Sequence, residues 1–206
     1  MLRQARSRAD MTFLETMAGP FAMGVTEPDE GARSGRNNDW RLVLDAKVTI
    51  DDITAFTVEP RPPARLDGEL DIPGLRDRIP FQDGVFRLFP SSDEAGRTLM
   101  IYELGFEHEG VRYHLAGRKS AGKRPNLIRL WSDTTTLDVR LHRGVDAGGD
   151  VVGAGVLRLS VAQLARMVVS VRTPGSGSPI GTARTVGGFA WLFLKNLAGS
   201  YLSRSS

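Results

Sequence analysis

Residues 131–144 read WSDTTTLDVRLHRG, and the second half of this stretch decides the fold class. Apolar and polar side chains alternate there, with Leu137, Val139 and Leu141 in one set of positions and Asp138, Arg140 and His142 in the other. Successive side chains of a strand point to opposite faces of a sheet. The alternation therefore predicts a strand with one buried face that ends at Gly144.

Similar alternation recurs along the chain and predicts a β-rich protein. Further strands are expected at residues 11–21, 40–48, 97–107, 111–117 and 156–159, with Gly19-Pro20 ending the first. His108-Glu109-Gly110 is expected to close a hairpin between the third and fourth of these. Asp83-Gly84 predicts another hairpin, between residues 79–81 and 85–89. Residues 64–72 allow two interpretations, a hairpin around Asp67-Gly68 or one strand with an interior glycine.

Segments without alternation are expected to be loops or helices. Residues 24–38 are predicted to be a mobile surface loop, residues 119–126 a basic polar loop, and residues 145–153 a glycine-rich turn. Helical spacing predicts a short helix at residues 50–57, capped by Thr49 with Asp52. A second is expected after Ser160, with Gln163 in its capping box. A third, at residues 189–202, follows the Gly/Ser/Pro-rich segment 173–181.

These patterns divide the chain into four parts. They are a disordered basic tail at residues 1–10, a β-rich domain at 11–172, a linker at 173–184 and a C-terminal helix at 185–206. The expected domain is mainly β, a barrel or sandwich of about eight to ten strands with two short capped helices. The amphipathic C-terminal helix completes the expected fold.

Composition excludes several classes of function. The 206 residues include no cysteine, which rules out disulfides, thiolate metal sites and cysteine nucleophiles. The 27 Lys and Arg and 24 Asp and Glu give a net charge of +3 and are interleaved, unlike the basic stripe of a nucleic-acid-binding protein. No apolar run approaches the ~20 residues that span a bilayer, and no signal segment follows MLRQARSRAD. We therefore expect a cytoplasmic protein without a nucleic-acid partner.

Two glycine-rich motifs do not meet the requirements of nucleotide sites. Residues 117–123, GRKSAGK, match the spacing of a phosphate-binding loop, but Arg124 replaces the magnesium-binding hydroxyl and Pro125 prevents the following helix. Gly153-Ala154-Gly155 begins a dinucleotide fingerprint, but Arg158 stands in place of the third glycine. His108 lies between Glu107 and Glu109 without a metal-ligand spacing. We expect no cofactor, no metal and no catalytic residue.

The candidate ligand-binding residues lie on and beside the opening stretch. The hydroxyl-rich segment before residue 137 can form the polar rim of a pocket, although threonines also pair across strands without any function. The two strand histidines can face one another and meet Asp133 or Asp138 as an acid–base pair, or can simply lie on the solvent side of the sheet. The candidates are Trp131, Asp133, Thr135, His114 and His142.

The predicted C-terminal helix carries a broad apolar arc. It can pack on its own domain, dock on a partner or lie on a membrane surface, and its polar arc offers only Lys195 to an anionic membrane. A partner surface would bury the apolar residues, including those of a second copy in a homodimer. The candidate partner-binding residues are Phe189, Trp191, Phe193, Leu197 and Tyr201.

Several short motifs occur in a characteristic order. They are FLETMAG at 13–19, DGVFRLF at 83–89, DTTTL at 133–137, RLHRG at 140–144 and LRLS at 157–160, followed by the aromatic-rich tail. In this order, over residues 12–202, the chain resembles the β-rich region that large bacterial proteins carry beside a flavin oxidoreductase module of the cholesterol-oxidase (glucose–methanol–choline) type, sometimes with an α/β-hydrolase module. The resemblance implies a setting in sterol, lipid or other apolar alcohol oxidation. It also favours a single strand at residues 64–72.

The expected function is therefore a non-catalytic accessory or binding module. It would bind an apolar small molecule or a partner enzyme, such as a flavin oxidoreductase or a hydrolase. Two alternatives remain open at this point. One is a hydrolase or isomerase that uses His114 or His142, and the other is an assembly domain that dimerises through its C-terminal helix.

Overall fold

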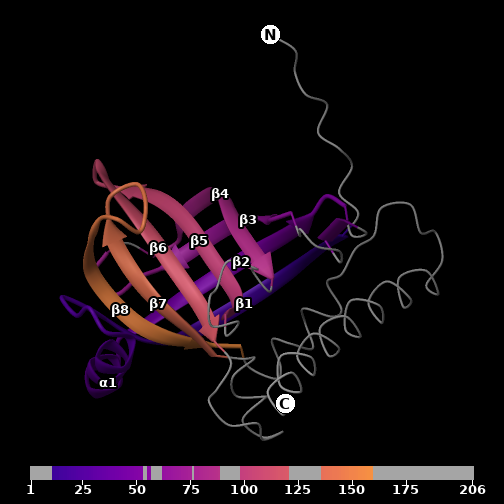
Figure 1. The fold of residues 1–206 in the computed structure, drawn as a ribbon. Coiled ribbons are helices and arrows are strands. Elements are labelled where there is room, and N and C mark those ends of the chain that lie inside the picture. Colours follow the sequence, from indigo (N-terminus) through magenta and orange to yellow (C-terminus); the bar gives the residue numbers. More distant parts are fainter. Residues whose placement is uncertain are drawn as a thin grey trace, which may run out of the picture.

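The described part of the chain is a closed barrel of eight antiparallel strands in sequence order (Figure 1). It comes from a computed structural model that describes residues 11–52, 55–56, 62–75, 77–88, 98–120 and 136–159. The strands are β1 (Met11–Met23), β2 (Arg41–Ile50), β3 (Ala64–Asp71), β4 (Ile79–Leu88), β5 (Thr98–His108), β6 (Val111–Ser120), β7 (Thr136–Arg143) and β8 (Asp150–Arg158). One helix, α1 (Pro28–Asn38), lies between β1 and β2. The predicted β-rich barrel is confirmed.

The ring closes because β8 pairs with β1. Ala18 lies opposite Arg158, and Phe21 lies opposite Gly155. Closure leaves neither of these strands with an unpaired edge, which removes a site where other chains could add a strand. The hairpin predicted between β5 and β6 is also confirmed. Glu109 and Gly110 both have positive φ, as the favoured two-residue hairpin turn requires.

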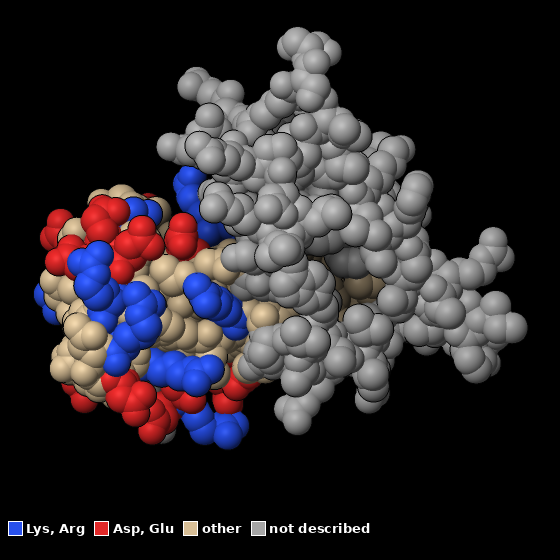
Figure 2. Space-filling model, turned by 90° about the horizontal axis from the view of Figure 1, so that it is seen from below, with Lys and Arg blue, Asp and Glu red and all other residues tan. Residues whose placement is uncertain are grey.

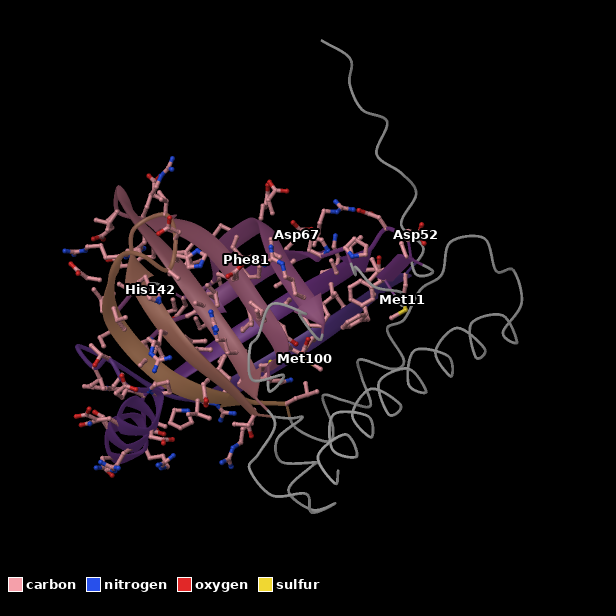
Figure 3. The ribbon with its side chains drawn as sticks, in the orientation of Figure 1. Met11, Asp52, Asp67, Phe81, Met100 and His142 are labelled. Carbon is pink, nitrogen blue, oxygen red and sulfur yellow. The ribbon has the colours of Figure 1, made fainter. Side chains whose placement is uncertain are left out.

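Every strand contributes apolar residues to the core of the barrel. The buried set of the predicted alternation is confirmed, since Leu137, Val139 and Leu141 are fully buried, but His142 in the polar set is buried as well. Phe81 and Met100, labelled in Figure 3, belong to the same core. An eight-stranded barrel has an interior just wide enough to be filled by side chains or to hold one small ligand. The content of that interior therefore bears on function.

The prediction that residues 24–38 form a surface loop is wrong, because α1 occupies most of them. Pro28 starts the helix, acidic residues occupy its first turn and Arg36 its last turn. Its buried face consists of small residues, so no apolar periodicity revealed it. A Cβ on Gly31 would lie 2.0 Å from the Ala154 carbonyl oxygen, so glycine lets α1 approach β8 closely.

Two sites where the sequence predicted a strand to end lie within strands. Gly19-Pro20 does not end the first strand, which continues to Met23 with Pro20 opposite Arg41. Asp83-Gly84 does not form the predicted hairpin, because both residues lie within β4. The pairing register shifts there, between the Leu66–Gly84 and Gly68–Phe81 pairs. Positive φ at Asp83 thus accommodates a β-bulge rather than a turn.

The segment that follows β2 also differs from the prediction. Thr49 belongs to β2 and caps no helix. Asp52 takes that role, since the Ala55 amide donates to its carboxylate at 2.8 Å and the Phe56 amide to its carbonyl at 2.9 Å. The remaining residues of the predicted 50–57 helix lie outside the described ranges. So do the helix expected after Ser160, the linker and the C-terminal helix.

The remaining strand predictions agree with the barrel. Residues 64–71 form one strand with Gly68 in its interior, as the family resemblance favoured and against the Asp67-Gly68 hairpin. β8 begins at Asp150, so the glycine-rich turn is shorter than predicted. Lys119 belongs to β6 and not to the basic loop assigned to residues 119–126. Ser120 also belongs to β6, and residues 121–126 lie outside the described ranges.

Candidate functional site inside the barrel

Three polar side chains lie within the apolar core of the barrel. Glu15 is on β1, Tyr102 on β5 and Lys119 on β6, and their exposed fractions are 6%, 3% and 2%. We refer to these three residues as the buried polar trio. A buried charge is costly unless other groups compensate it, so such residues are rare in a core that serves stability alone.

The trio is connected across the width of the barrel. The Tyr102 hydroxyl oxygen lies 3.1 Å from Glu15 Oε1 and 3.0 Å from Oε2, and it donates a hydrogen bond to this carboxylate. β1 and β5 are opposite one another in the eight-stranded ring, so this hydrogen bond crosses the interior. Lys119 Nζ lies 5.8 Å from the centroid of the Tyr102 ring, within the range of a cation–π interaction.

Aromatic and apolar side chains surround Tyr102. The Phe86 ring is tilted against it, with 5.0 Å between the centroids, and Phe56 stacks on Phe86 at 6.3 Å. Met100 Sδ is 3.9 Å from the Tyr102 hydroxyl. This shell keeps the local dielectric low, which strengthens interactions among the trio and raises the cost of any charge left uncompensated.

Burial shifts the protonation of two trio members. Burial raises the pKa of Tyr102 well above its ordinary value, and the charge of Glu15 and the hydrogen bond to it add to the effect. Burial lowers the pKa of Lys119, while the Glu15 carboxylate opposes that change. Tyr102 therefore remains a hydrogen-bond donor, and the buried Lys119 side chain holds its proton less tightly than an exposed lysine, because its pKa is lowered.

The sequence contained a signal for this site that our prediction did not use. Glu15 alternates in step with Phe13 and Met17, and Lys119 continues the series of Tyr113 and Leu115. A charged residue that falls on the buried positions of an alternating strand indicates a charge inside the core. Lys119 was instead assigned to a polar loop, and no sequence pattern shows that strands β1, β5 and β6 bring the three side chains together.

The two predicted strand histidines meet on the outer face of the barrel. His114 and His142 are paired in register, with 6.3 Å between ring centroids. His142 is buried, and its Nδ1 lies 2.9 Å from the Gly149 carbonyl oxygen. Burial lowers the pKa of His114, with smaller opposing effects from Glu103 and Asp146 and a lowering effect from His142.

Asp138, one of the two acid–base partners predicted for these histidines, is not beside them. Asp138 lies opposite Arg118, four positions along β7 from His142. Figure 3 shows His142 toward one end of the barrel, with Met11 and Asp52 at the other. The remaining candidates lie outside the described residues: Trp131, Asp133, Thr135, Phe189, Trp191, Phe193, Leu197 and Tyr201.

A concavity lies at the end of the barrel that carries the β5–β6 turn. It has a volume of about 520 Å³ and is lined by Gly74, Leu75, His108, Glu109, Val111, Tyr113 and Arg143. Tyr113 and Lys119 are six residues apart on β6, which corresponds to about 20 Å along a strand. The pocket and the polar trio are therefore separate places on the barrel.

Comparisons with protein-family models, with curated proteins and with solved structures found no match. Within the described ranges, no group of three or more His, Asp or Glu side chains is arranged to hold a metal ion. No helix in the described part of the chain is long and apolar enough to cross a membrane. Basic and acidic side chains are interspersed on the face seen in Figure 2.

Proposed function

We propose that the barrel is a non-catalytic binding module that holds an apolar small molecule, with the polar end of that molecule at the buried polar trio. The observation that carries the proposal is the state of Lys119. Its ammonium is almost fully buried, and no described residue accepts a hydrogen bond from it. An ammonium has three donors, and leaving them unsatisfied in a core is costly.

A ligand with a polar end and an apolar body would complement this interior. Its oxygen would accept from Lys119, while its body would contact the surrounding Phe86, Phe56 and Met100 side chains. Small-molecule sites have this composition, a mainly apolar lining with a few polar groups that fix orientation. The trio supplies those polar groups, and the rest of the core supplies the lining.

The family resemblance supplies the proposed biological setting. We propose that the bound molecule belongs to sterol, lipid or other apolar alcohol metabolism, and that a flavin oxidoreductase or a hydrolase is the partner enzyme. The short motifs in residues 13–19, 83–89 and 140–144 support this part of the proposal. Dimerisation through the predicted C-terminal helix is compatible with it.

The experiment measures ligand binding by the full chain. Sterols, fatty alcohols and fatty acids are screened by thermal shift and by native mass spectrometry. Lys119→Met is compared with Arg118→Met, which removes the neighbouring, exposed cation from the outer face. We expect a stabilising ligand for the wild type and for Arg118→Met, and loss of binding in Lys119→Met. The proposal would be contradicted if no compound bound the wild type, or if both variants bound the ligand equally.

The histidine pair supports one alternative function. The rings of His114 and His142 lie 6.3 Å apart, and the hydrolase or isomerase hypothesis uses one of them together with a nearby carboxylate. An esterase and isomerase screen of the wild type against the double variant His114→Gln/His142→Gln tests that hypothesis. Activity that the double variant lacks, while its thermal stability is retained, would favour an enzyme over a binding module.

A further inference from the structure

We infer that the polar end of the ligand is uncharged, a hydroxyl or a carbonyl rather than a carboxylate, phosphate or ammonium. This inference rests on the proposed function, because it concerns the same site. It adds the chemical class of the molecule that the barrel selects.

The buried charges of the described core balance one another. Glu15 is its one buried carboxylate, and Lys119 is its one buried ammonium. An anionic ligand would leave a net negative charge in the interior, and a cationic ligand a net positive one. Either excess is unfavourable where the dielectric is low, whereas a neutral ligand preserves the balance.

The hydrogen-bonding groups of the trio lead to the same conclusion. The Tyr102 hydroxyl already donates to Glu15, so Lys119 supplies the donors that remain. A ligand hydroxyl can accept from Lys119 and donate to Glu15, and a carbonyl can accept from Lys119. A ligand carboxylate would also accept from Lys119, but it would bring a second negative charge next to Glu15.

The pKa of Lys119, which burial lowers, does not change the expected preference. If the amine were neutral, Glu15 would make the site negative, and an anion would bind even less well. The Tyr102 hydroxyl lies within hydrogen-bonding distance of both Glu15 oxygens and donates to this carboxylate. An anion is disfavoured in both protonation states of Lys119.

The test uses three ligands with the same alkyl chain and different polar ends: 1-dodecanol, dodecanoate and dodecyltrimethylammonium. Their dissociation constants for the full wild-type chain are measured by calorimetry at neutral pH, below the concentrations at which they form micelles. We expect dodecanol to bind on the order of tenfold more tightly than either charged compound. Equal or tighter binding of a charged compound would overturn the inference, even though the proposed binding function would stand.

Removing one buried charge provides the second arm of the experiment. In Glu15→Gln the Lys119 charge is no longer balanced, so the preference should move toward dodecanoate by on the order of tenfold. Glu107→Gln, an exposed position on β5, should leave the ratio of dissociation constants unchanged. An unchanged ratio in folded Glu15→Gln would overturn the inference. Failure of all three compounds to bind the wild type would instead contradict the proposed function itself.

Discussion

Tyr102 donates a hydrogen bond to Glu15 from the opposite side of the barrel, 3.0 Å from one carboxylate oxygen and 3.1 Å from the other. The two residues are 87 positions apart in the sequence. Their contact therefore exists only when the ring of strands has formed. It also places a carboxylate within an apolar core, where its charge opposes the lowering of the Lys119 pKa by burial. The stability of the protein should reflect this arrangement in several measurable ways.

Removing one of the two buried charged side chains, Glu15 or Lys119, should be worse than removing both. Lys119→Met leaves the Glu15 charge uncompensated and should lower the free energy of unfolding by roughly 3–5 kcal/mol. The double variant Glu15→Leu/Lys119→Met should recover most of that loss, because apolar side chains often replace a buried pair without cost. Urea denaturation measures both values, with Arg118→Met as the control. A double variant no more stable than the single one would contradict the prediction.

The hydrogen bond across the barrel should contribute to stability on its own. Tyr102→Phe removes the donor to a buried carboxylate and should cost about 1.5–3 kcal/mol of unfolding free energy. Tyr113→Phe is the matched control, since it retains the ring that stacks on Phe106 at 5.4 Å. Chemical denaturation of the two variants distinguishes them. Equal losses would mean that the Tyr102 hydroxyl contributes nothing specific.

Alkaline pH should destabilise the barrel through Tyr102. Its pKa in the folded protein is raised above the ordinary value of 10.0, mainly by burial. The resulting stability is fully present below pH 10.0 and is lost as the pH rises from there toward the folded pKa, because only the unfolded chain then releases the proton. Ultraviolet absorbance should show one tyrosine that ionises later than the others. Tyr102→Phe should unfold with a weaker dependence on alkaline pH.

Adding a methyl group to α1 should destabilise the protein, although alanine is normally the better helix residue. Gly→Ala in a helix interior usually gains up to about 1 kcal/mol. In Gly31→Ala the new Cβ would collide with the Ala154 backbone, and we expect a loss of roughly 1–3 kcal/mol instead. Arg33→Ala, on the exposed side of α1, is the control. Thermal unfolding that shows Gly31→Ala to be stabilised would contradict the close packing.

The fold class could be read from the sequence because strand alternation is a local property. The spacing of Leu137, Val139 and Leu141 indicates their common face without information from any other strand. α1 could not be recognised, since its buried face has glycine and alanine where helical periodicity requires large apolar residues. The Asp83-Gly84 pair gave a wrong hairpin prediction for another reason. Positive φ suits both a hairpin turn and a β-bulge, and only the partner strand distinguishes them.

The candidate site was less accessible to sequence analysis than the fold. The contact between His114 and His142 was anticipated because both lie on strands with a predictable face. The polar trio was not, since it depends on which strands are opposite one another in the closed ring. Alternation assigns Glu15 to the buried face, but the position of Tyr102 across from it follows from the number of strands in the barrel.

The pairing of β8 with β1 has a consequence for how the molecule assembles. A ribosome makes β1 well before β8, so the nascent chain must hold one side of β1 without its final neighbour until Arg158 can reach Ala18. Contacts between such distant segments slow folding, and an unpaired strand promotes association with other chains. Closure by β8 should therefore be the slow step of refolding and the step at which crowding or heat diverts the protein into aggregates.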